Sequence, residues 1–371
     1  MRIAIARTMA EFSIDIYTNS LISGLKAVRP NWEIIELAPR SFNRGSSSWS
    51  LRVRKYYERF WKYPHTVQQK VADIYHIIEP CDAHLIYSLK KTGKPTVVTC
   101  HDLINFFYPN NLQGSVQLPL ISRNAWLYSV KGMKYADHII AVSTATAKDT
   151  TEILKINPSQ ITVIPNAVES IFKPLPPEQI TSFRQQQGIA PATICLLNVG
   201  ANHPRKNISI ILQVIEILMR KGLSIQFWKV GADFTDDQKN FIDTSGISSC
   251  VKYLGNPDKL TLVQIYNAAD ILVAPSLYEG FGITILEAMA CGTPVITSNV
   301  SAMPEVVGDA GVLVNPRDAK EIANAVINLY DNPSYYQEIK QKNLTRTKLF
   351  TWEKTADNVA EVYEHLLKRR T

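Results

Sequence analysis

The sequence predicts an α/β protein made of two doubly wound domains. Short apolar runs rich in β-branched residues alternate with amphipathic helical stretches along the chain. Such alternation is typical of parallel sheets whose two faces are both covered by helices. The pattern is interrupted once, by the proline-rich segment 166–179, and resumes at residue 193; a length of 371 residues suits two such domains better than one.

Each half contains segments with the composition of buried strands. In the first half these are residues 2–6, 33–37, 83–88, 96–100, 138–143 and 161–165; in the second half they are 193–200, 224–231, 251–255, 270–276, 294–298 and 311–314. Because parallel strands need helical crossovers, this spacing predicts two Rossmann-like domains that face a cleft. We expect an N-terminal domain over residues 1–170, a C-terminal domain over 180–350, and a final helix within 351–371 that could pack back on the first domain.

The positive charge is concentrated in the first half of the chain. Residues 1–175 hold 21 lysines and arginines against 13 acids, a balance of +8, whereas the remainder carries −1, which gives +7 overall. A basic half indicates an anionic partner such as a phosphate, a lipid headgroup or a nucleic acid. No nucleic-acid-binding motif accompanies the charge, so we expect no nucleic-acid partner.

Cysteine spacing and hydropathy favour a cytoplasmic protein. The five cysteines are widely spaced and form no CxxC pair, which predicts free thiols rather than a disulfide framework or a zinc site. The most apolar helical stretch, residues 208–219, is shorter than a bilayer span and contains Gln213 and Glu216. The N-terminus has the pattern of a strand and a helix, not of a signal peptide.

The stretch YEGFGITILEAMACGTPVITS, residues 278–298, has the composition of a ligand-binding loop followed by a helix. It follows the buried strand 270–276, and ligands of open α/β sheets bind beyond the carboxyl ends of the strands. Gly280 and Gly282 allow the backbone to approach a ligand closely. The helix expected from Ile283 would present free N–H groups and a positive dipole end to an anion.

Glu279 and Glu287 lie eight positions apart around this turn. Taken singly, each is typical of a solvated surface charge. Taken together on one segment, they could contact a single ligand from opposite ends, and a carboxylate that accepts two hydrogen bonds suits a ribose diol.

The segment PSLYEGFGITILEAMACGTPVI, residues 275–296, closely resembles the E-x7-E signature of the retaining GT-B glycosyltransferases of the family-4 type. Thr284 departs from that signature, because many members have proline there. The resemblance implies that Glu287 binds the nucleotide ribose and that Glu279 lies beside the transferred sugar. It also implies that the turn and the helix start contact the sugar and the phosphates of the donor, through Gly280, Phe281, Gly282 and Ile283.

The segment NVGANHPRKNISIIL, residues 198–212, has the pattern of a strand, a loop and a helix, with Arg205 and Lys206 at the end of the loop. Two cations beside a helix N-terminus can clamp a diphosphate and stabilise the charge of a departing nucleoside diphosphate. A bare Arg-Lys pair is more often a solvated basic loop. The family has a similar G…R/K-x-K-N pattern here, which implies a catalytic role for the pair and donor binding at Gly200.

The segment CHDLINFFYP, residues 100–109, places a His-Asp pair at the carboxyl end of the expected strand 96–100. An isolated pair of this kind is usually a buried histidine capped by the aspartate. The family has a similar pair whose histidine lies near the transferred sugar, which implies a catalytic-site role for His101. Many members also carry a glycine pair after the first strand, whereas residues 6–15 contain none, so we expect an acceptor pocket of a different shape.

The segment RVRKYYERFWKY, residues 52–63, is basic and aromatic at near-helical spacing. It could lie against an anionic membrane surface, which would suit a lipid-linked acceptor. The alternative is a surface helix of the first domain that buries its aromatic side chains in the core.

These features together predict a glycosyltransferase that moves a hexose, of the mannose or the glucose/GlcNAc type, from a nucleotide-diphosphate sugar to a hydroxyl of a saccharide or lipid-linked acceptor. The resemblance implies retention of anomeric configuration, no metal or other cofactor, and a role in polysaccharide biosynthesis, in the cytoplasm or peripherally at the inner membrane face. GDP-mannose is the leading donor and UDP-sugars come next. The alternatives are a GT-B sugar-nucleotide epimerase, a glycan phosphorylase and a non-catalytic module that binds nucleotide sugar.

Overall fold

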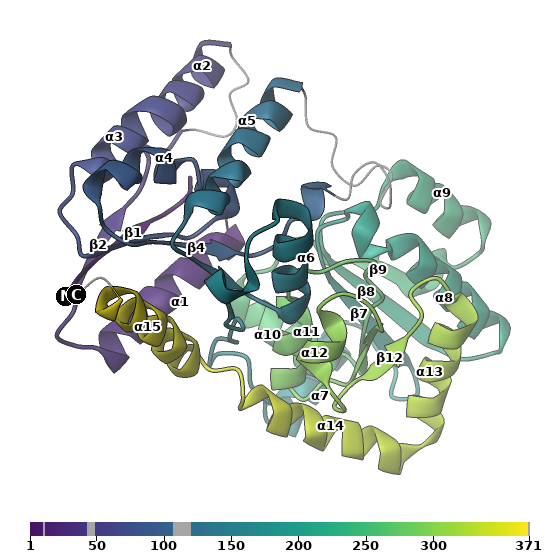
Figure 1. Ribbon diagram of the computed structural model, residues 1–371. Coiled ribbons are helices and arrows are strands. Elements are labelled where there is room, and N and C mark those ends of the chain that lie inside the picture. The colour runs from purple at the N-terminus through teal and green to yellow at the C-terminus, as the bar shows by residue number, and fades with distance from the viewer. Residues whose placement is uncertain (10–11, 43–48, 107–119, 370–371) are drawn as a thin grey trace. The chain divides into compact units, whose positions relative to one another are not determined.

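The computed structural model describes residues 1–9, 12–42, 49–106 and 120–369 (Figure 1). The described chain divides into two compact units. The first contains Met1–Phe106, the segment that ends at Asn166, and the segment from Trp352 onward; the second contains Ala167–Thr351. Residues 10–11, which belong to the glycine-free stretch after the first strand, lie outside the described residues.

The first unit is built on a parallel sheet that has six strands among the described residues. Their order is β2 (Glu33–Leu37), β1 (Arg2–Ala6), β3 (Ile74–Ile77), β4 (Thr96–Cys100), β5 (His138–Ala141) and β6 (Ile161–Val163). Side chains alternate between the two faces: Ile3 and Ile5 belong to one hydrophobic cluster, and Ala4 and Ala6 to another.

Helices cover both faces of this first sheet. The Ile3 face packs against α1 (Phe12–Val28) and α15 (Trp352–Lys368). The Ala4 face packs against α3 (Tyr63–Gln68), α4 (Leu85–Leu89), α5 (Leu120–Lys131) and α6 (Thr144–Leu154). The helical stretch before α3 consists of α2 (Trp49–Tyr57) and a π-helical turn, η1 (Glu58–Lys62).

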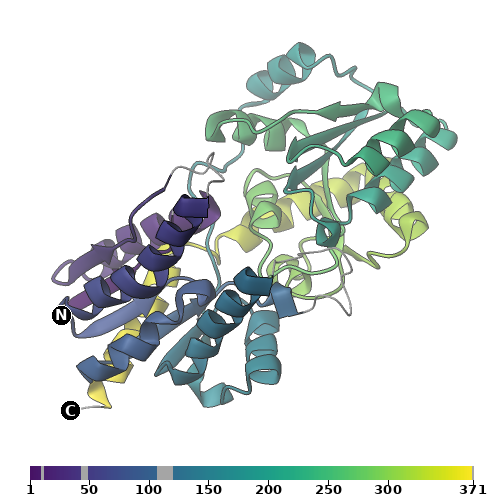
Figure 2. The same ribbon diagram turned by 90° about the horizontal axis from the view of Figure 1, so that it is seen from above.

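Helix α15 lies beside α1 although the two helices are the last and the first of the chain (Figures 1 and 2). Their approach depends on small residues: a Cβ atom added at Gly24 would lie only 2.7 Å from Cβ of Ala356. The Tyr363 hydroxyl also reaches Nδ1 of the buried His76 at 2.5 Å. The last helix therefore completes the core of the first unit.

The second unit has the same architecture, again with a parallel sheet of six described strands. Their order is β12 (Val312–Val314), β11 (Val295–Ser298), β10 (Ile271–Ala274), β7 (Ile194–Gly200), β8 (Ile225–Gly231) and β9 (Val251–Tyr253). One face packs against α8 (Ile208–Arg220), α9 (Asp236–Thr244), α13 (Ala319–Asp331) and α14 (Pro333–Thr347). Packing on the other face involves α7 (Pro177–Gln186), α10 (Lys259–Ala268) and α11 (Ile283–Ala290); α12 (Met303–Val307) follows β11.

The predicted α/β fold with two doubly wound domains is confirmed. Numbered within the second unit, the strand order is 3-2-1-4-5-6, the order of dinucleotide-binding sheets, whereas the first unit has the order 2-1-3-4-5-6. The connections reverse direction between β7 and β10 in the second unit and between β1 and β3 in the first. Ligands of such sheets bind outside the carboxyl ends of the strands at these switch points.

The predicted strand at residues 83–88 is wrong. The third strand of the sheet is β3, Ile74–Ile77, and residues 85–89 form helix α4. Leu85, Ile86 and Leu89 are all buried, and their spacing is that of one face of a helix. A short apolar run such as residues 83–88 does not by itself distinguish a strand from a helix. Strand β3 was missed because it contains the polar residue His76. Its ring is buried in the fold and forms hydrogen bonds with the Tyr363 hydroxyl and, at 2.8 Å, with the Thr99 hydroxyl.

Among the described residues, no helix combines the length and the apolar content that crossing a bilayer requires.

Candidate functional site

Two loops meet at the switch point of the second unit. One follows β7 and contains the 3-10 turn Pro204–Lys206; the other follows β10 and leads into α11. The backbone N–H of Leu277 donates to the Arg205 carbonyl at 2.7 Å. Asn207, which has a left-handed backbone (φ 60°), donates from its side chain to the Pro275 carbonyl at 3.0 Å. These bonds hold the loops in a fixed relation.

Glu279 lies at the centre of this junction and is paired with two cations. Its carboxylate is 2.6 Å from Nη1 of Arg205 and 2.6 Å from Nζ of Lys206, and it accepts a hydrogen bond from the Ser276 hydroxyl at 2.8 Å. The residue is 7% exposed. Burial opposes ionisation, but the charges of Lys206 and Arg205 outweigh it and lower the pKa of Glu279 to about 2. Two positive charges and one negative charge therefore share this buried site.

A third cation, Lys229, lies at the carboxyl end of the neighbouring strand β8. The side chain is fully buried, and its ammonium donates to the Gly200 carbonyl at 2.7 Å and to the Val230 carbonyl at 2.8 Å. Burial, with the nearby charge of Lys206, lowers the pKa of Lys229 to about 8. Lys229 belongs to none of the motifs singled out in the sequence, although a lysine inside the apolar strand IQFWKVG is itself an unusual signal.

Gly200, the last residue of β7, lies between two of these cations. Its φ is +135°, and a Cβ atom there would lie 3.5 Å from Cε and 3.6 Å from Nζ of Lys206. On the other side its carbonyl accepts from Lys229. Gly231 must also lack a side chain, because a Cβ there would lie 2.3 Å from the Gly200 carbonyl oxygen. Gly231 thus allows the end of β8 to lie close against Gly200, and Gly200 provides the positive φ at the end of β7.

The turn before α11 has the predicted form. Gly282 has φ +102° and precedes the first helical residue, Ile283, and no side chain caps the helix start. Phe281 is buried, with its ring 6.0 Å from that of Phe350, so its side chain anchors the turn while the backbone remains to contact a ligand. Gly280 is also buried within the turn. Gly292, with φ +78°, follows the end of the helix.

Glu287 lies on α11, apart from the hydrogen bonds of the Glu279 network. Its half-buried carboxyl accepts a hydrogen bond from the Tyr266 hydroxyl of α10 at 2.8 Å. Burial raises the pKa of Glu287 to about 7, against the opposing effect of Tyr266. Tyr266 binds one oxygen of the carboxyl group, and within the described ranges of the chain the other oxygen accepts no side-chain hydrogen bond. Tyr266 was not singled out in the sequence, since its position on a separate helix gives no local signal.

His101 belongs to the first unit, after β4, where the sequence predicts it. Its Nε2 atom donates to the Ile78 carbonyl at 3.1 Å, and its ring makes an edge contact with Tyr17 at 4.6 Å. Burial lowers the pKa of His101 to about 4, so the ring is neutral at pH 7. With the proton on Nε2, the lone pair of a neutral ring is on Nδ1. Its site role stays a prediction.

The second unit brings cations and strand-end glycines together at the switch point of a doubly wound sheet. This arrangement is typical of α/β proteins that bind a phosphate-bearing nucleotide. Two family descriptions match this chain: "Glycosyltransferase Family 4" over residues 12–170 and "Glycosyl transferases group 1" over residues 193–332. The chain belongs to the group 1, family-4 glycosyltransferases, as the residues of the Glu279–Glu287 segment indicate.

Curated relatives and solved structures agree with this membership. The chain is 27% identical over 280 residues to the serotype-specific mannosyltransferase WbdA of Escherichia coli, which covers 74% of this chain and 34% of WbdA. It is 30% identical over 233 residues to the O-antigen chain mannosyltransferase B of E. coli, covering 62% of this chain and 60% of that protein. It therefore spans about a third of the first relative's length and three fifths of the second's. The sucrose-phosphate synthase of Thermosynechococcus elongatus has the same GT-B fold, with a TM-score of 0.80 at 21% identity and full coverage of both chains.

Proposed function

We propose that the protein transfers a hexose from a nucleoside-diphosphate sugar to a hydroxyl of a saccharide or lipid-linked acceptor, with retention of anomeric configuration. The observation that carries this proposal is the excess of buried positive charge at the switch point. Arg205 and Lys206 share the single carboxylate of Glu279, and Lys229 donates to the neighbouring Gly200 carbonyl. A diphosphate supplies the missing negative charge, so we propose donor binding without a metal ion.

The same residues support a division of roles within the donor site. Arg205 and Lys206 would neutralise the leaving diphosphate, and the free N–H groups at the start of α11 would contact the sugar and phosphates. Glu287, with one side of its carboxyl group fixed by Tyr266, would accept hydrogen bonds from the ribose diol. Glu279 would then contact the sugar through the face of its carboxylate not taken by the two cations.

The ionised, paired state of Glu279 favours a front-face reaction over one that passes through a covalent glycosyl-enzyme intermediate. A carboxylate with a pKa of about 2 that is paired with two cations is both a weak base and a weak nucleophile. In the proposed step the acceptor oxygen bonds to the anomeric carbon as the bond from that carbon to the diphosphate oxygen breaks. The acceptor proton passes to the departing diphosphate. The His101 Nδ1 lone pair could orient an acceptor hydroxyl.

GDP-mannose is the proposed donor, with UDP-sugars as the second choice. The names of the two E. coli relatives, both mannosyltransferases, support mannose. Thermal-shift measurements with UDP, GDP, ADP and the common nucleotide sugars of each, first without metal and then with Mg²⁺, would identify the donor. One nucleotide family at about 100 times its dissociation constant should stabilise the protein by about 2.7 kcal/mol. Glu287→Ala and Arg205→Ala should lose this shift, and Glu178→Ala, on the exposed first turn of α7, should keep it.

Turnover distinguishes transfer from the alternatives. With the donor that binds, a transferase should form a product with the anomeric configuration of the donor, seen by NMR, only when an acceptor is present. Conversion of the donor without an acceptor would indicate an epimerase, and binding without conversion would indicate a non-catalytic module. The absence of a thermal shift with every nucleotide would contradict the donor site itself.

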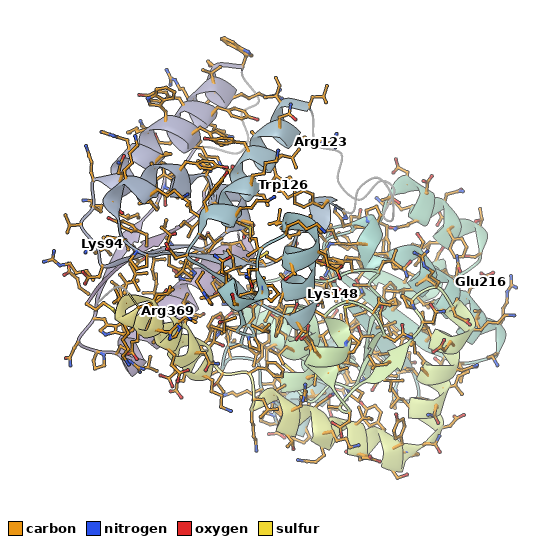
Figure 3. All side chains as sticks on the ribbon, viewed as in Figure 1. Lys94, Arg123, Trp126, Lys148, Glu216 and Arg369 are labelled. Atoms are coloured by element: carbon orange, nitrogen blue, oxygen red, sulfur yellow. The ribbon has the colours of Figure 1, made fainter. Side chains whose placement is uncertain are left out.

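We also propose that the first unit contacts an anionic membrane, which would place a cytoplasmic enzyme at the inner membrane face. Helix α2 and η1 leave Trp49, Tyr57 and Trp61 exposed by 80%, 59% and 73%. The alternative, in which the aromatic side chains of residues 52–63 are buried, is supported in part by Phe60, which is half-buried. The only acid among residues 49–62 is Glu58, which is buried. The start of α5 adds the exposed Leu120, Ile121 and Arg123 beside α2 (Figures 1 and 3). We call residues 49–62 and 120–123 the basic aromatic face.

Vesicle sedimentation tests this contact. The protein should bind vesicles that contain phosphatidylglycerol and not vesicles of phosphatidylcholine alone, because the basic aromatic face combines cations with exposed aromatic rings. Trp61→Ser should reduce binding severalfold, whereas Tyr330→Ser, at an exposed aromatic of α13, should leave it unchanged. Equal binding to both kinds of vesicle, or to neither, would count against the proposal.

A further inference from the structure

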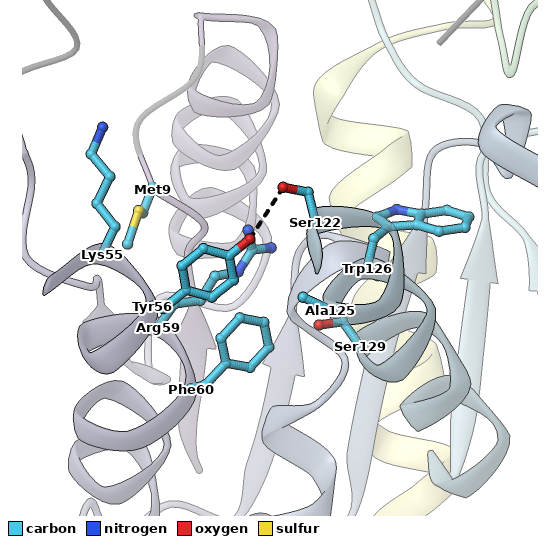
Figure 4. Close-up of a pocket in the computed structure, with 9 residues that line it drawn as sticks. All are labelled: Met9, Lys55, Tyr56, Arg59, Phe60, Ser122, Ala125, Trp126 and Ser129. Atoms are coloured by element: carbon cyan, nitrogen blue, oxygen red, sulfur yellow. Dashed lines mark hydrogen bonds between the residues drawn. The ribbon is translucent and has the colours of Figure 1, made fainter. Parts of the chain in front are cut away.

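The first unit contains a cavity of about 320 Å³ between the α2–η1 helix and α5 (Figure 4). Tyr56 and Phe60 point from the α2–η1 helix toward α5, where Ala125 and Ser129 face them. The hydroxyls of Tyr56 and Ser122 form a hydrogen bond of 3.2 Å that joins the two helices. A cavity of this volume holds a small organic ligand or one end of a larger one.

The cavity lies at the switch point of the first sheet. Met9, which lines it, follows β1. Arg59, which also lines it, donates from Nη2 to the Cys81 carbonyl at 2.6 Å and from Nε to Asp82 at 2.9 Å, and both of these residues follow β3. Strands β1 and β3 are neighbours across the point where the connections reverse. The cavity therefore occupies the place where an open α/β sheet binds its ligand.

The lining of the cavity is mostly apolar and aromatic. Tyr56, Phe60 and Trp126 contribute rings, and Met9 and Ala125 contribute aliphatic surface. The rings are held by neighbours within the unit: Phe60 lies 4.6 Å from the His84 ring and Trp126 lies 4.8 Å from the Phe106 ring. A hydrocarbon chain would be removed from water on entering such a site.

Two cations, Lys55 and Arg59, accompany the apolar lining. Arg59 is held in place by Asp82, which balances its charge. Lys55 lies beside Met9 at one side of the cavity (Figure 4) and forms no ion pair within the described part of the chain. The acid closest to it in sequence, Glu58, is engaged with Lys62 at 3.5 Å. The cavity thus carries one uncompensated positive charge next to an apolar interior, which suits an amphiphilic anion.

We propose that this cavity binds the phosphate end of a lipid-linked acceptor, with the phosphate at Lys55 and Arg59 and the first part of the hydrocarbon chain against Tyr56, Phe60 and Trp126. Naming the ligand as the acceptor rests on the proposed function. A lipid phosphate fits better than a free sugar phosphate because Lys55, Tyr56 and Arg59 also belong to the basic aromatic face. A lipid held at that face would need to move its phosphate only a short way to enter the cavity.

Binding of a soluble isoprenyl phosphate to the full chain tests the cavity. Farnesyl phosphate, kept below its aggregation limit, should bind in calorimetry, farnesol should bind at least about tenfold more weakly for want of the charged contact, and inorganic phosphate should not compete. Lys55→Gln should weaken farnesyl phosphate binding by about tenfold. Ala125→Phe should abolish it by filling the cavity. If Ala125→Phe does not fold, the affinity of Lys55→Gln for farnesyl phosphate is by itself the test of the proposal.

Two neighbouring substitutions serve as matched controls. Lys131→Gln changes an exposed charge on α5 outside the basic aromatic face, and Asn124→Phe adds a ring on the same helix, but neither residue lines the cavity. Both variants should bind farnesyl phosphate as the unmodified protein does. Wild-type affinity in Lys55→Gln and Ala125→Phe, or a loss in the controls equal to theirs, would overturn the proposal. Equal affinity for glucose 1-phosphate and farnesyl phosphate would overturn the lipid assignment.

Nucleotide binding by the same preparations separates this proposal from the proposed function. The cavity variants should keep the thermal shift with the donor nucleotide, because the Glu279 network lies in the other unit. A retained nucleotide shift without farnesyl phosphate binding to the unmodified protein would refute the cavity proposal and leave the donor site intact. Farnesyl phosphate binding without any nucleotide shift would refute the donor site instead.

Discussion

Glu279→Ala is expected to lower the free energy of unfolding of the ligand-free protein by about 3–5 kcal/mol. The substitution leaves Arg205 and Lys206 close together in a buried site without their shared carboxylate. Added diphosphate or donor nucleotide should restore much of this loss, because it supplies the missing negative charge. The variant should thus show a larger ligand-induced thermal shift than the wild-type protein, although its turnover is lost.

Acid titration of stability provides an independent measurement of the same interaction. The folded pKa of Glu279, about 2, lies below the ordinary value of 4.5, so its stabilising effect is complete above about pH 4.5 and is lost as the pH falls toward 2. That shift corresponds to about 3 kcal/mol. Urea denaturation between pH 5 and pH 2.5 should show this dependence in the wild-type protein and in Glu178→Ala, and not in Glu279→Ala. Parallel curves for all three proteins would show that the pairing contributes little.

Lys229→Met is expected to act in the opposite direction and to raise stability at pH 7. The folded pKa of Lys229, about 8, lies below its ordinary value of 10.5, so keeping the ammonium charged in the fold costs about 3 kcal/mol at pH 7. Methionine removes that cost and loses two hydrogen bonds to carbonyl groups, worth roughly 1–2 kcal/mol together. The net gain should be about 1–2 kcal/mol.

The pH dependence of Lys229→Met distinguishes this explanation from a general packing effect. The wild-type protein should lose stability, relative to the variant, as the pH falls from 10.5 to 8, because the unfolded chain takes up the Lys229 proton first. Urea denaturation at pH 7, 9 and 10 measures this difference, with Lys221→Met at an exposed position as the control. The same variant should bind inorganic diphosphate on the order of tenfold more weakly. If the variant is less stable and its diphosphate affinity is unchanged, Lys229 only holds the Gly200 loop in place and does not contribute to diphosphate binding.

The contrast between these two variants explains why the buried charges are retained. Lys229 is expected to destabilise the empty protein, whereas Glu279 offsets the charges of Arg205 and Lys206. A site that binds a diphosphate needs an excess of positive charge, and the folded state carries the cost of keeping that charge out of water. We therefore expect stability and diphosphate affinity to change in opposite directions at Lys229.

The local sequence was sufficient to predict most of the secondary structure and the loops of the proposed donor site. Apolar β-branched runs followed by Gly-rich turns identified β7 and β10, and the positions of Gly282 and Gly292 matched the start and end of α11. These features depend on backbone preferences within a few residues, so they can be read without the fold. The strand assigned to residues 83–88 failed because a short apolar run has no intrinsic preference strong enough to choose between strand and helix.

Only the tertiary structure determined which side chains meet. The sequence by itself established the α/β class, the family and the positions of Glu279, Glu287, Arg205 and Lys206. It did not show that both cations hold one carboxylate, that Tyr266 fixes Glu287, or that Lys229 lies against Gly200. It also gave no sign of the cavity between the α2–η1 helix and α5. Such contacts join residues that are apart in the chain, and they arise only when parallel strands bring their carboxyl ends together and the covering helices pack side by side.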